Sequence, residues 1–434
     1  MKRCAVSGWW VAVLLSAQAA SAQTLQSPGR PSHPITVHGA ISVLADTFPA
    51  QNRTREIRTR VRLEVTAEPR TWMRLRVEGV AEGLVANRGW ASGLASAANI
   101  RLREAWTELH SEHVDVRVGF GRLVWGRLDE VMPSDVINPI DTASFFLEGR
   151  SAARLPVAFI RTRVFLPADT RLELVAALPG HRSRFDLLDE ASSPFNLLND
   201  AIWPAGVAVR GGVSREEPPV AWASLQGGAR VSTTVRLVDM SVSAWRGVEG
   251  FGLVSFETQF EPGPVPAVVG ELVERYPRFT MVATDAEMVV GPWAIRSEIA
   301  GFVDKTLSGV RGPVAGKAFD AGLGVDRAVG PFRVFGSTVW HREWAPAESS
   351  LTRSYVNVIG SIERRFARER HLVRIFGVAN PADASGFVRG VWSWNLRDNV
   401  SVDGSGGLFL GSGNDVVSRF AGRDFAFLRV AYLF

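Results

Sequence analysis

The chain has 434 residues, of which 46% are hydrophobic and 21% are charged, and its formal net charge is +5. Its only cysteine is Cys4, close to the N-terminus, so the rest of the chain is excluded from disulfide and thiol chemistry. No basic-aromatic tract points to nucleic acid, and nothing after the N-terminal segment resembles a membrane-spanning helix.

The first residues have the pattern of a secretory signal peptide. Lys2 and Arg3 precede an apolar run over 9–15, and small residues then form an A-x-A cleavage site that ends at Ala22. The apolar run is shorter than the ~20 residues that a membrane anchor helix needs. We therefore expect cleavage near Ala22. The expected parts are a signal peptide at 1–22, a short tether at 23–33 and a single domain at 34–434.

From residue 34 onward, apolar and polar side chains alternate with period two in one segment after another. The clearest case is 56–67, where Val61 and Leu63 alternate with Arg60 and Arg62. Such alternation is typical of β-strands with one apolar and one polar face. The predicted strands are 34–46, 56–67, 72–84, 100–110, 114–122, 156–166, 170–178, 221–232, 235–246, 275–290, 293–304, 317–328, 332–343, 354–367, 371–380, 386–397, 400–410 and 424–434.

The connections between these segments alternate in length. Every second connection is short, for example 68–71, 110–113 and 291–292, and most of those between are long. Outer-membrane barrels sort their connections into short periplasmic turns and long external loops, whereas a soluble β-sandwich, the alternative, does not. The sequence therefore predicts an all-β fold, a transmembrane antiparallel up-and-down β-barrel of about 18 strands. The expected long loops are 85–99, 123–155, 179–220, 247–274, 305–316 and 411–423.

The last segment, 424–434, has an apolar row on one face that ends with Tyr432 and Phe434. Pairing of this strand with the first one would close the cylinder and leave no free edge. The segment resembles the terminal strand of bacterial outer-membrane proteins, in which a C-terminal Phe marks the chain for the barrel-insertion machinery. The resemblance implies that Phe434 is an assembly signal, and that outer-membrane lipid and the insertion machinery are partners.

Arginine dominates the positive charge, since the only lysines are Lys2, Lys305 and Lys317. Inside a barrel of this size, the strand arginines would line a water-filled channel and would favour anionic solutes. Carboxylates share the same face, so the alternative is a ladder of structural ion pairs without selectivity. The predicted inward positions are Arg58, Arg60, Arg62, Arg74, Arg76, Arg117, Arg161, Arg163, Arg171, Arg296, Arg333, Arg374 and Arg389.

The stretch 119–156 breaks the strand pattern. It contains many apolar residues that need burial, so we expect it to fold into the barrel after the fifth strand and to narrow the lumen. Fixed charges there can select solutes, or they can pair with one another and only pin the loop. The predicted constriction residues are Arg122, Trp125, Arg127, Asp129, Asp135, Asn138, Asp141, Arg150 and Arg154. A calcium site on the three aspartates and the asparagine of this set is an alternative, although their spacing matches no EF-hand loop.

The same stretch carries a family resemblance. Trp125-Gly126 with Asp129, then the run from Asp135 to Asp141, and then Arg154-Leu155-Pro156 are similar to a motif W-G-x-x-D … D-V-x-N-P-x-D. This motif is found in a family of poorly characterised, porin-like outer-membrane barrels of Gram-negative bacteria. The resemblance implies a channel or transport function and names no solute.

The expected function is an outer-membrane porin-like channel for small hydrophilic, anionic solutes, located in the bacterial outer membrane after signal cleavage. One alternative is a channel for hydrophobic or aromatic compounds. Another is a binding or adhesion barrel that acts through its external loops. We expect no enzymatic activity, no cofactor, no metal and no nucleic-acid partner, and a homo-oligomer is possible.

Overall fold

The computed structural model describes residues 35–51, 54–87, 93–178, 182–200, 208–261, 267–309, 312–345, 353–413 and 415–434. The predicted signal peptide and tether lie outside these described residues. Most of the described chain is β-strand, and the helices are short.

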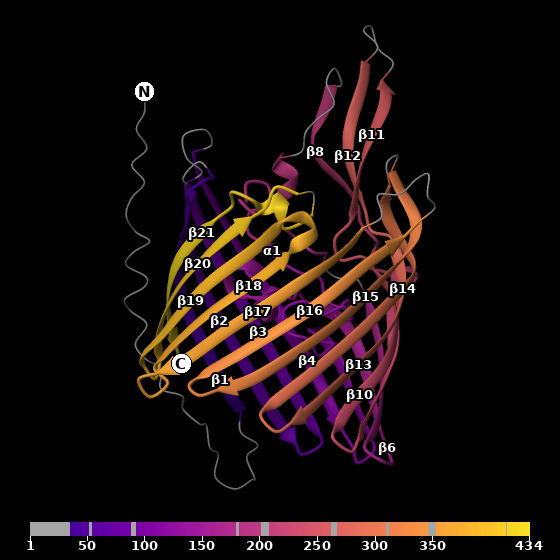
Figure 1. Cartoon of the computed structure of the whole chain (residues 1–434), viewed down its shortest axis with the longest axis vertical. Helices are drawn as coiled ribbons and strands as arrows, with labels where there is room; N and C mark the ends of the chain where they lie inside the picture. The colour runs from indigo at the N-terminus through magenta and orange to yellow at the C-terminus, as the bar shows by residue number, and fades with distance from the viewer. Residues whose placement is uncertain are drawn as a thin grey trace.

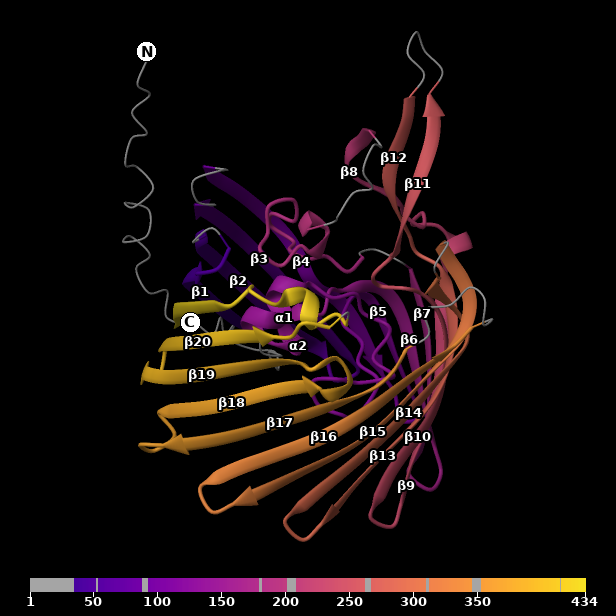
Figure 2. The same cartoon turned by 45° about the horizontal axis from the view of Figure 1, so that its top comes forward.

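Eighteen strands form one closed antiparallel sheet, which confirms the predicted fold and strand number. Each strand pairs with the next strand of the sheet, and the last pairs with the first. Figure 1 shows the barrel from the side, and Figure 2 shows it with its upper end turned forward. The strands are β1 (Ile35–Phe48), β2 (Thr54–Arg70), β3 (Met73–Asn87), β4 (Leu94–His110), β5 (Val114–Gly121), β6 (Val157–Leu166), β7 (Thr170–Leu178), β9 (Gln226–Val235), β10 (Val238–Val248), β13 (Arg278–Val290), β14 (Trp293–Gly309), β15 (Gly312–Val329), β16 (Phe332–Trp344), β17 (Ser354–Phe366), β18 (His371–Asn380), β19 (Ser385–Arg397), β20 (Val400–Leu410) and β21 (Phe425–Leu433).

Two predicted strands were displaced along the chain. The predictions 221–232 and 235–246 correspond to β9 and β10, which start later. The residues before β9 instead form a 3-10 turn at Trp222–Ser224. The tight turn between the strands lies at Arg236, whose φ is +57°. The apolar residues ahead of β9 have a pattern similar to that of a strand, so the first prediction began too early. The turn between β9 and β10 contains no glycine or proline that would mark it.

The barrel closes between β1 and β21. Their register places Val43 opposite Val430. Phe434 extends the pairing, because its N–H donates to the carbonyl of Gly39 (3.0 Å) and its carbonyl accepts from the N–H of Gly39 (2.7 Å). A Cβ at Gly39 would lie 2.2 Å from a ring carbon of Phe434. The missing side chain of Gly39 therefore makes room for the terminal ring.

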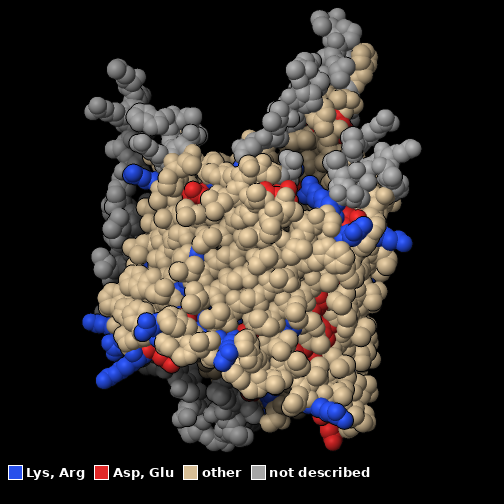
Figure 3. All heavy atoms as spheres, viewed as in Figure 1, with Lys and Arg blue, Asp and Glu red and all other residues tan. Residues whose placement is uncertain are grey.

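The two faces of the wall differ as the alternation predicted. In β2, Ile57 and Val61 face outward and are about half exposed (51% and 46%). The side chains of Arg58 and Arg60 face inward and are 15% and 24% exposed. Figure 3 shows that most of the visible wall is uncharged and that charged side chains gather mainly toward its two ends. An apolar outer band with a polar interior is the arrangement that a lipid bilayer requires of a barrel.

One end of the barrel carries short turns and the other carries the long connections. Gly291 and Gly330, with φ of +56° and +57°, form two of the short turns. The predicted long loop 305–316 is wrong, because β14 and β15 continue as a paired hairpin up to Gly309 and from Gly312. The predicted loop 85–99 is likewise shortened by longer β3 and β4 strands. In both places the chain keeps its cross-strand backbone hydrogen bonds past the point where the apolar pattern ends.

A second, three-stranded sheet was not predicted. It consists of β8 (Ala208–Glu216), β11 (Leu253–Glu261) and β12 (Ala267–Arg275). β12 lies in the middle, antiparallel to β11 and parallel to β8. Figure 1 shows this sheet rising beyond the end of the barrel that carries the long connections. From the sequence, these residues were expected in the two external loops 179–220 and 247–274, with a further strand at 206–214 as an alternative; β8 occupies most of that segment.

The two α-helices both belong to the connection between β5 and β6. They are α1 (Thr142–Glu148) and α2 (Arg150–Ala153). Among the described residues, none of the helices has the length and apolar character needed to cross a membrane.

Candidate solute passage

The connection between β5 and β6, residues 122–156, lies inside the barrel, as predicted (Figure 2). We call it the inward segment. Its side chains and backbone contact the inner faces of strands on opposite sides of the lumen, among them β7, β14 and β20. Together these contacts determine which parts of the lumen stay open.

A buried carboxylate on β14 holds the first part of the inward segment. Glu298, with 0% exposure, accepts hydrogen bonds from the backbone N–H groups of Arg127 (3.0 Å), Leu128 (3.2 Å) and Ser134 (2.6 Å). The Ser134 hydroxyl donates a further bond of 2.7 Å. Leu128 packs where Gly322 has no side chain, since a Cβ there would lie 2.4 Å from it. The first part of the segment is thus held by hydrogen bonds from its backbone to Glu298 and by packing of Leu128 against Gly322.

Two tryptophans hold the segment against the neighbouring part of the wall, since β10 lies two strands from β14 in the sheet. Trp125 and Trp245 of β10 are each 1% exposed and meet edge to face with ring centroids 5.5 Å apart. The indole N–H of Trp125 donates to Glu173 of β7 (2.8 Å). Its burial is therefore combined with a satisfied hydrogen bond, as buried indoles require. Trp125 anchors the segment to the wall.

Side chains of the sequence motif connect the beginning and the end of the inward segment to each other. Asn138 accepts from the N–H of Leu123 (2.8 Å) and donates to the carbonyl of Leu155 (2.7 Å), which joins the two ends of the segment. Asp135 accepts from Arg150 (3.0 Å) and from Arg154 (2.8 Å). Asp135 thus pairs with two arginines of the same segment, which is the pinning arrangement considered from the sequence.

The four residues of the calcium alternative are directed to separate partners. Asp129 pairs with Arg296 of β14 (3.2 Å). Asp135 and Asn138 make the contacts described above. Asp141 caps α1 by accepting from the backbone N–H of Ser144 (3.4 Å), and it also accepts from the Ser144 hydroxyl (2.5 Å). Within the described residues, no group of three or more potential metal ligands is found.

α1 is seated in a cluster of phenylalanines. Phe146 meets the rings of Phe387, Phe409 and Phe420 with centroids 5.2, 4.8 and 4.9 Å apart, and stacks on Phe195 at 5.4 Å. All five rings are buried. Burial of this many aromatic rings is a large hydrophobic contribution to the docking of α1. The cluster fills the lumen beside β19–β21.

A second connection, residues 182–200, also enters the mouth of the barrel, where the sequence analysis expected only an external loop. Its backbone pairs with the inward segment through Thr142 N–H to the carbonyl of Arg184 (2.8 Å). Its Asp186 accepts from Arg58 of β2 (2.6 Å). Burial and the nearby charge of Asp186 raise the pKa of Asp141 to about 7. Burial also acts to raise the pKa of Asp186, but the Arg58 guanidinium holds it below its usual range.

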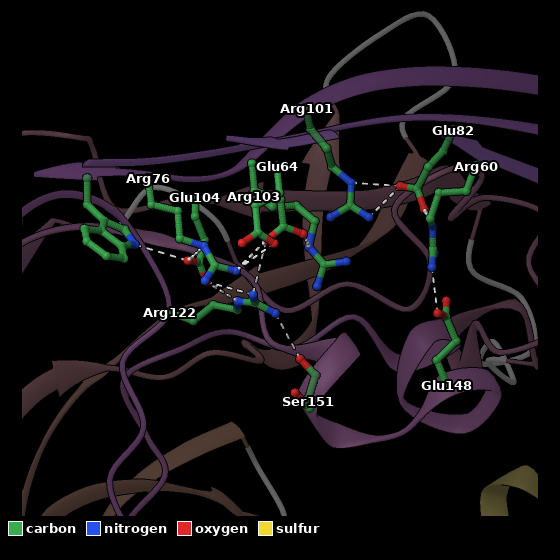
Figure 4. Close-up of polar contacts among 12 residues, drawn as sticks. Arg60, Glu64, Arg76, Glu82, Arg101, Arg103, Glu104, Arg122, Glu148 and Ser151 are labelled. Carbon is green, nitrogen blue, oxygen red and sulfur yellow. Dashed lines mark hydrogen bonds and ion pairs between the residues drawn. The ribbon is translucent and has the colours of Figure 1, made fainter. Parts of the chain in front are cut away.

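A polar network joins the inner face of β2–β4 to the helices (Figure 4). Arg60 bridges to Glu148 at the end of α1 (2.6 Å). Arg122 donates to Glu104 of β4 (2.7 Å) and to the carbonyl of Ser151 in α2 (3.3 Å). Burial would raise the pKa of Glu148, but Arg60 outweighs it, and the pKa is lowered to about 2. Glu148 therefore stays charged and keeps α1 attached to this wall.

Most of the predicted pore-lining arginines have carboxylate partners. The pairs are Arg58 with Asp186, Arg60 with Glu82 and Glu148, Arg74 with Glu68, Arg76 with Glu64 and Glu104, Arg117 and Arg161 with Glu108, Arg163 with Glu173, Arg296 with Glu287 and Asp129, Arg333 with Asp326, and Arg374 with Glu130. Within the described part of the chain, Arg62, Arg171 and Arg389 have no carboxylate within 4.0 Å.

Two adjoining cavities lie between the inward segment and the wall formed by β15–β21. One has a volume of about 430 Å³ and the other about 250 Å³. Both are lined by Glu130, Glu148, Glu363 and Arg374, and the smaller one also by Arg389. The arrangement provides a polar space on one side of the lumen, bounded by charged groups from both the wall and the segment.

Several residues of this site were not found from the sequence. Glu298 was recognised only as one inward carboxylate among several, because its partners lie more than 160 positions away in the chain. Arg101 and Arg103 were missed because the alternation of β4 slips between Arg103 and Glu104. Two adjacent charged residues within an alternating strand are a signal that could have pointed to this slip.

No protein-family model matches the sequence, and no curated protein matches it. Among solved structures, the chain is similar over 92% of its length to Pseudomonas aeruginosa OccK7 (OpdD), with 98% of that chain covered, 10% identity and a TM-score of 0.49. P. aeruginosa OccK2 (OpdF) in complex with glucuronate has 8% identity and a TM-score of 0.49, with 92% and 97% of the two chains covered. A loop deletion mutant of OmpT, an outer membrane protein of Vibrio cholerae, has 8% identity and a TM-score of 0.44, with 92% and 99% covered. These similarities concern only the fold of the barrel. The closure of the barrel is established independently, by the pairing of its strands.

Proposed function

We propose that the protein is a porin-like channel of the bacterial outer membrane through which small hydrophilic solutes diffuse. The observation that carries this proposal is the pair of adjoining cavities, lined in part by charged side chains, inside a barrel with an apolar outer surface. The predicted signal peptide and the terminal Phe434 agree with export and insertion by the barrel machinery. The inward segment is then the constriction of the channel, and its Arg150 and Arg154 line the larger cavity.

The proposed preference for anions rests on few residues. Most inward arginines are paired, and a paired arginine contributes little net charge to a passing solute. Arg62, Arg171 and Arg389 face the lumen without a carboxylate within 4.0 Å among the described residues. These three support a modest anion preference. Reversal potentials of single channels in a KCl gradient test it, and a preference for potassium contradicts it.

Liposome swelling tests the channel function itself. Proteoliposomes that contain the purified, heat-modifiable protein should swell in solutions of small sugars and carboxylates, at rates that fall with solute size. Protein-free liposomes and liposomes with heat-denatured protein are the controls. A folded barrel that passes no solute contradicts the proposal and favours an adhesion or binding role of the external loops.

A channel for aromatic compounds is the second candidate. The smaller cavity has an apolar side formed by Phe145, Phe376, Phe387 and Phe427. Aromatic rings of a solute could stack on these side chains during passage. In the swelling assay, this candidate predicts faster entry of an aromatic carboxylate than of an aliphatic one of similar size.

A further inference from the structure

Two arginines lie on the outer face of the barrel, close to the end that carries the short turns. Arg327 of β15 is two residues from the outward Val329, and Arg364 of β17 is two residues from the outward Ile362, so each shares the face of its neighbour. The strands β15, β16 and β17 lie side by side in the wall (Figure 1). Within the described residues, neither arginine has a carboxylate within 4.0 Å.

Aromatic rings contact these two arginines instead. The guanidinium carbon of Arg327 lies 4.5 Å from the ring centroid of Trp293, and that of Arg364 lies 5.3 Å from the ring centroid of Phe332. Each ring belongs to the residue directly opposite the arginine on the neighbouring strand, so both rings also face outward. Outward aromatic rings of membrane barrels form girdles at the two membrane interfaces. The two arginines therefore lie at the level of the lipid headgroups.

The turns beside these strands add further positive charge. Arg368 and Arg370 lie in the turn between β17 and β18, Arg397 ends β19, and all three are exposed. Within the part of the chain that the structure describes, none of the three has a carboxylate within 4.0 Å. The acidic residues of these two turns are Glu369 and Asp398. Together with the two outward arginines, these three form an edge with five arginines and two acidic residues outside ion pairs, which we call the arginine rim.

We propose that the arginine rim binds an anionic phospholipid of the adjacent leaflet, with the lipid phosphate held by Arg364 and the turn arginines beside it. The planar fork of a guanidinium matches the geometry of phosphate, and charge-assisted bonds between the two are strong. The excess of positive charge favours a lipid with net negative charge over a zwitterionic one. This binding goes beyond the proposed channel function and does not depend on it, because a barrel that conducts nothing offers the same outer face.

The position of the arginines supports a lipid as the partner. An outward arginine is strongly destabilising at the middle of the membrane and nearly neutral at the interface. At the interface, lipid phosphates are the anions that lie beside the barrel wall and accept from a guanidinium. The Nε of Arg327 is buried and has no hydrogen-bond partner among the described residues. The rim thus presents donors that the protein leaves without carboxylates, at the depth where phosphates lie.

Native mass spectrometry of the folded protein in detergent measures this binding. Phosphatidylglycerol should form a saturable adduct, and phosphatidylethanolamine with the same acyl chains should bind several-fold more weakly. Each arginine near an anionic lipid surface contributes a factor of about five in affinity. The Kd for phosphatidylglycerol should therefore rise about fivefold in Arg364→Gln and about 25-fold in Arg364→Gln with Arg368→Gln. Glycerol 3-phosphate, which carries the phosphate without acyl chains, should not displace the lipid.

Arg246→Gln is the matched control. Arg246 also lies on the outer face, in β10, but it pairs with Asp304, so its replacement should leave the Kd unchanged. An unchanged Kd in the double variant overturns the proposal, and Arg364→Gln alone decides if the double variant does not assemble. Equal affinity for the two lipids, or displacement by glycerol 3-phosphate, also overturns it. An oligomer that binds no lipid and dissociates in the rim variants makes this face an interface between copies of the chain instead.

Discussion

Replacement of Glu298 by glutamine should release the first part of the inward segment from the wall. In the native protein one carboxylate oxygen accepts from Arg127 and Leu128, and the other accepts twice from Ser134. A glutamine has nearly the same shape, but one of its two oxygens becomes an NH₂ group. That NH₂ group is itself a donor, so it would lie against N–H and O–H donors and could not accept their hydrogen bonds.

The size of the effect follows from the number of bonds lost. A hydrogen bond to a charged group contributes about 1.5–3 kcal/mol, so losing two of the four weakens docking of residues 127–134 by about 3–6 kcal/mol. The remaining parts of the segment keep their own contacts, Trp125 with Trp245 and Phe146 with its phenylalanine neighbours. We therefore expect local detachment, with the barrel strands unchanged.

Single-channel recording and limited proteolysis measure this detachment. Glu298→Gln should show a larger and noisier conductance than the wild type, and a new protease cut within 127–134, while heat-modifiable migration is retained. Glu64→Gln is the control, because Glu64 is also an inward carboxylate of the wall and pairs with Arg76 of β3 (3.1 Å). Conductance and proteolysis identical to the wild type in Glu298→Gln would refute the reasoning.

Three further predictions follow from packing and protonation. The pKa of Asp141 is raised from 3.8 to about 7. Docking of the helices should therefore be strongest below about pH 4 and should weaken as the pH rises through 7. Asp141→Asn should remove this pH dependence, which is measured as channel noise between pH 4 and 8. Gly39→Leu should clash with the ring of Phe434 and impair closure, seen as a lower temperature of heat-modifiable unfolding, and an unchanged temperature would count against the closure described here. Phe146→Ala should weaken docking of α1 by about 3–5 kcal/mol and make the segment sensitive to protease, whereas protease resistance equal to the wild type would contradict its central place in the cluster.

The wall of the barrel could be predicted from the sequence, because every strand repeats the same local requirement. The order of an apolar and a charged residue, such as Val61 and Arg62, is enough to predict which face of the strand contacts lipid and which contacts the lumen. The closing strand and the inward direction of residues 122–156 followed from the same reasoning about burial. The turn at Arg236 contains no glycine or proline and so carries no comparable local signal, and the two strands beside it were displaced.

The interior could be predicted only in part, because its contacts join distant parts of the chain. The excess of arginine was visible in composition, but the pairing of Arg58 with Asp186 depends on a connection that was expected outside the barrel. The hydrogen bonds that Glu298 accepts come mainly from backbone N–H groups, which no side-chain pattern reveals. Arg103 required knowledge of the register between β3 and β4, since only a β-bulge between these strands turns it inward.

We expect the closed barrel, although narrowed by residues 122–156, to leave an open passage for small ions and solutes. The most direct measurement is the conductance of single, purified molecules in a planar bilayer. We predict discrete, stepwise openings with a linear current–voltage relation, and a larger step when Glu298 is replaced by glutamine. Folded, heat-modifiable protein that inserts into the bilayer but produces no conductance steps would contradict the claim.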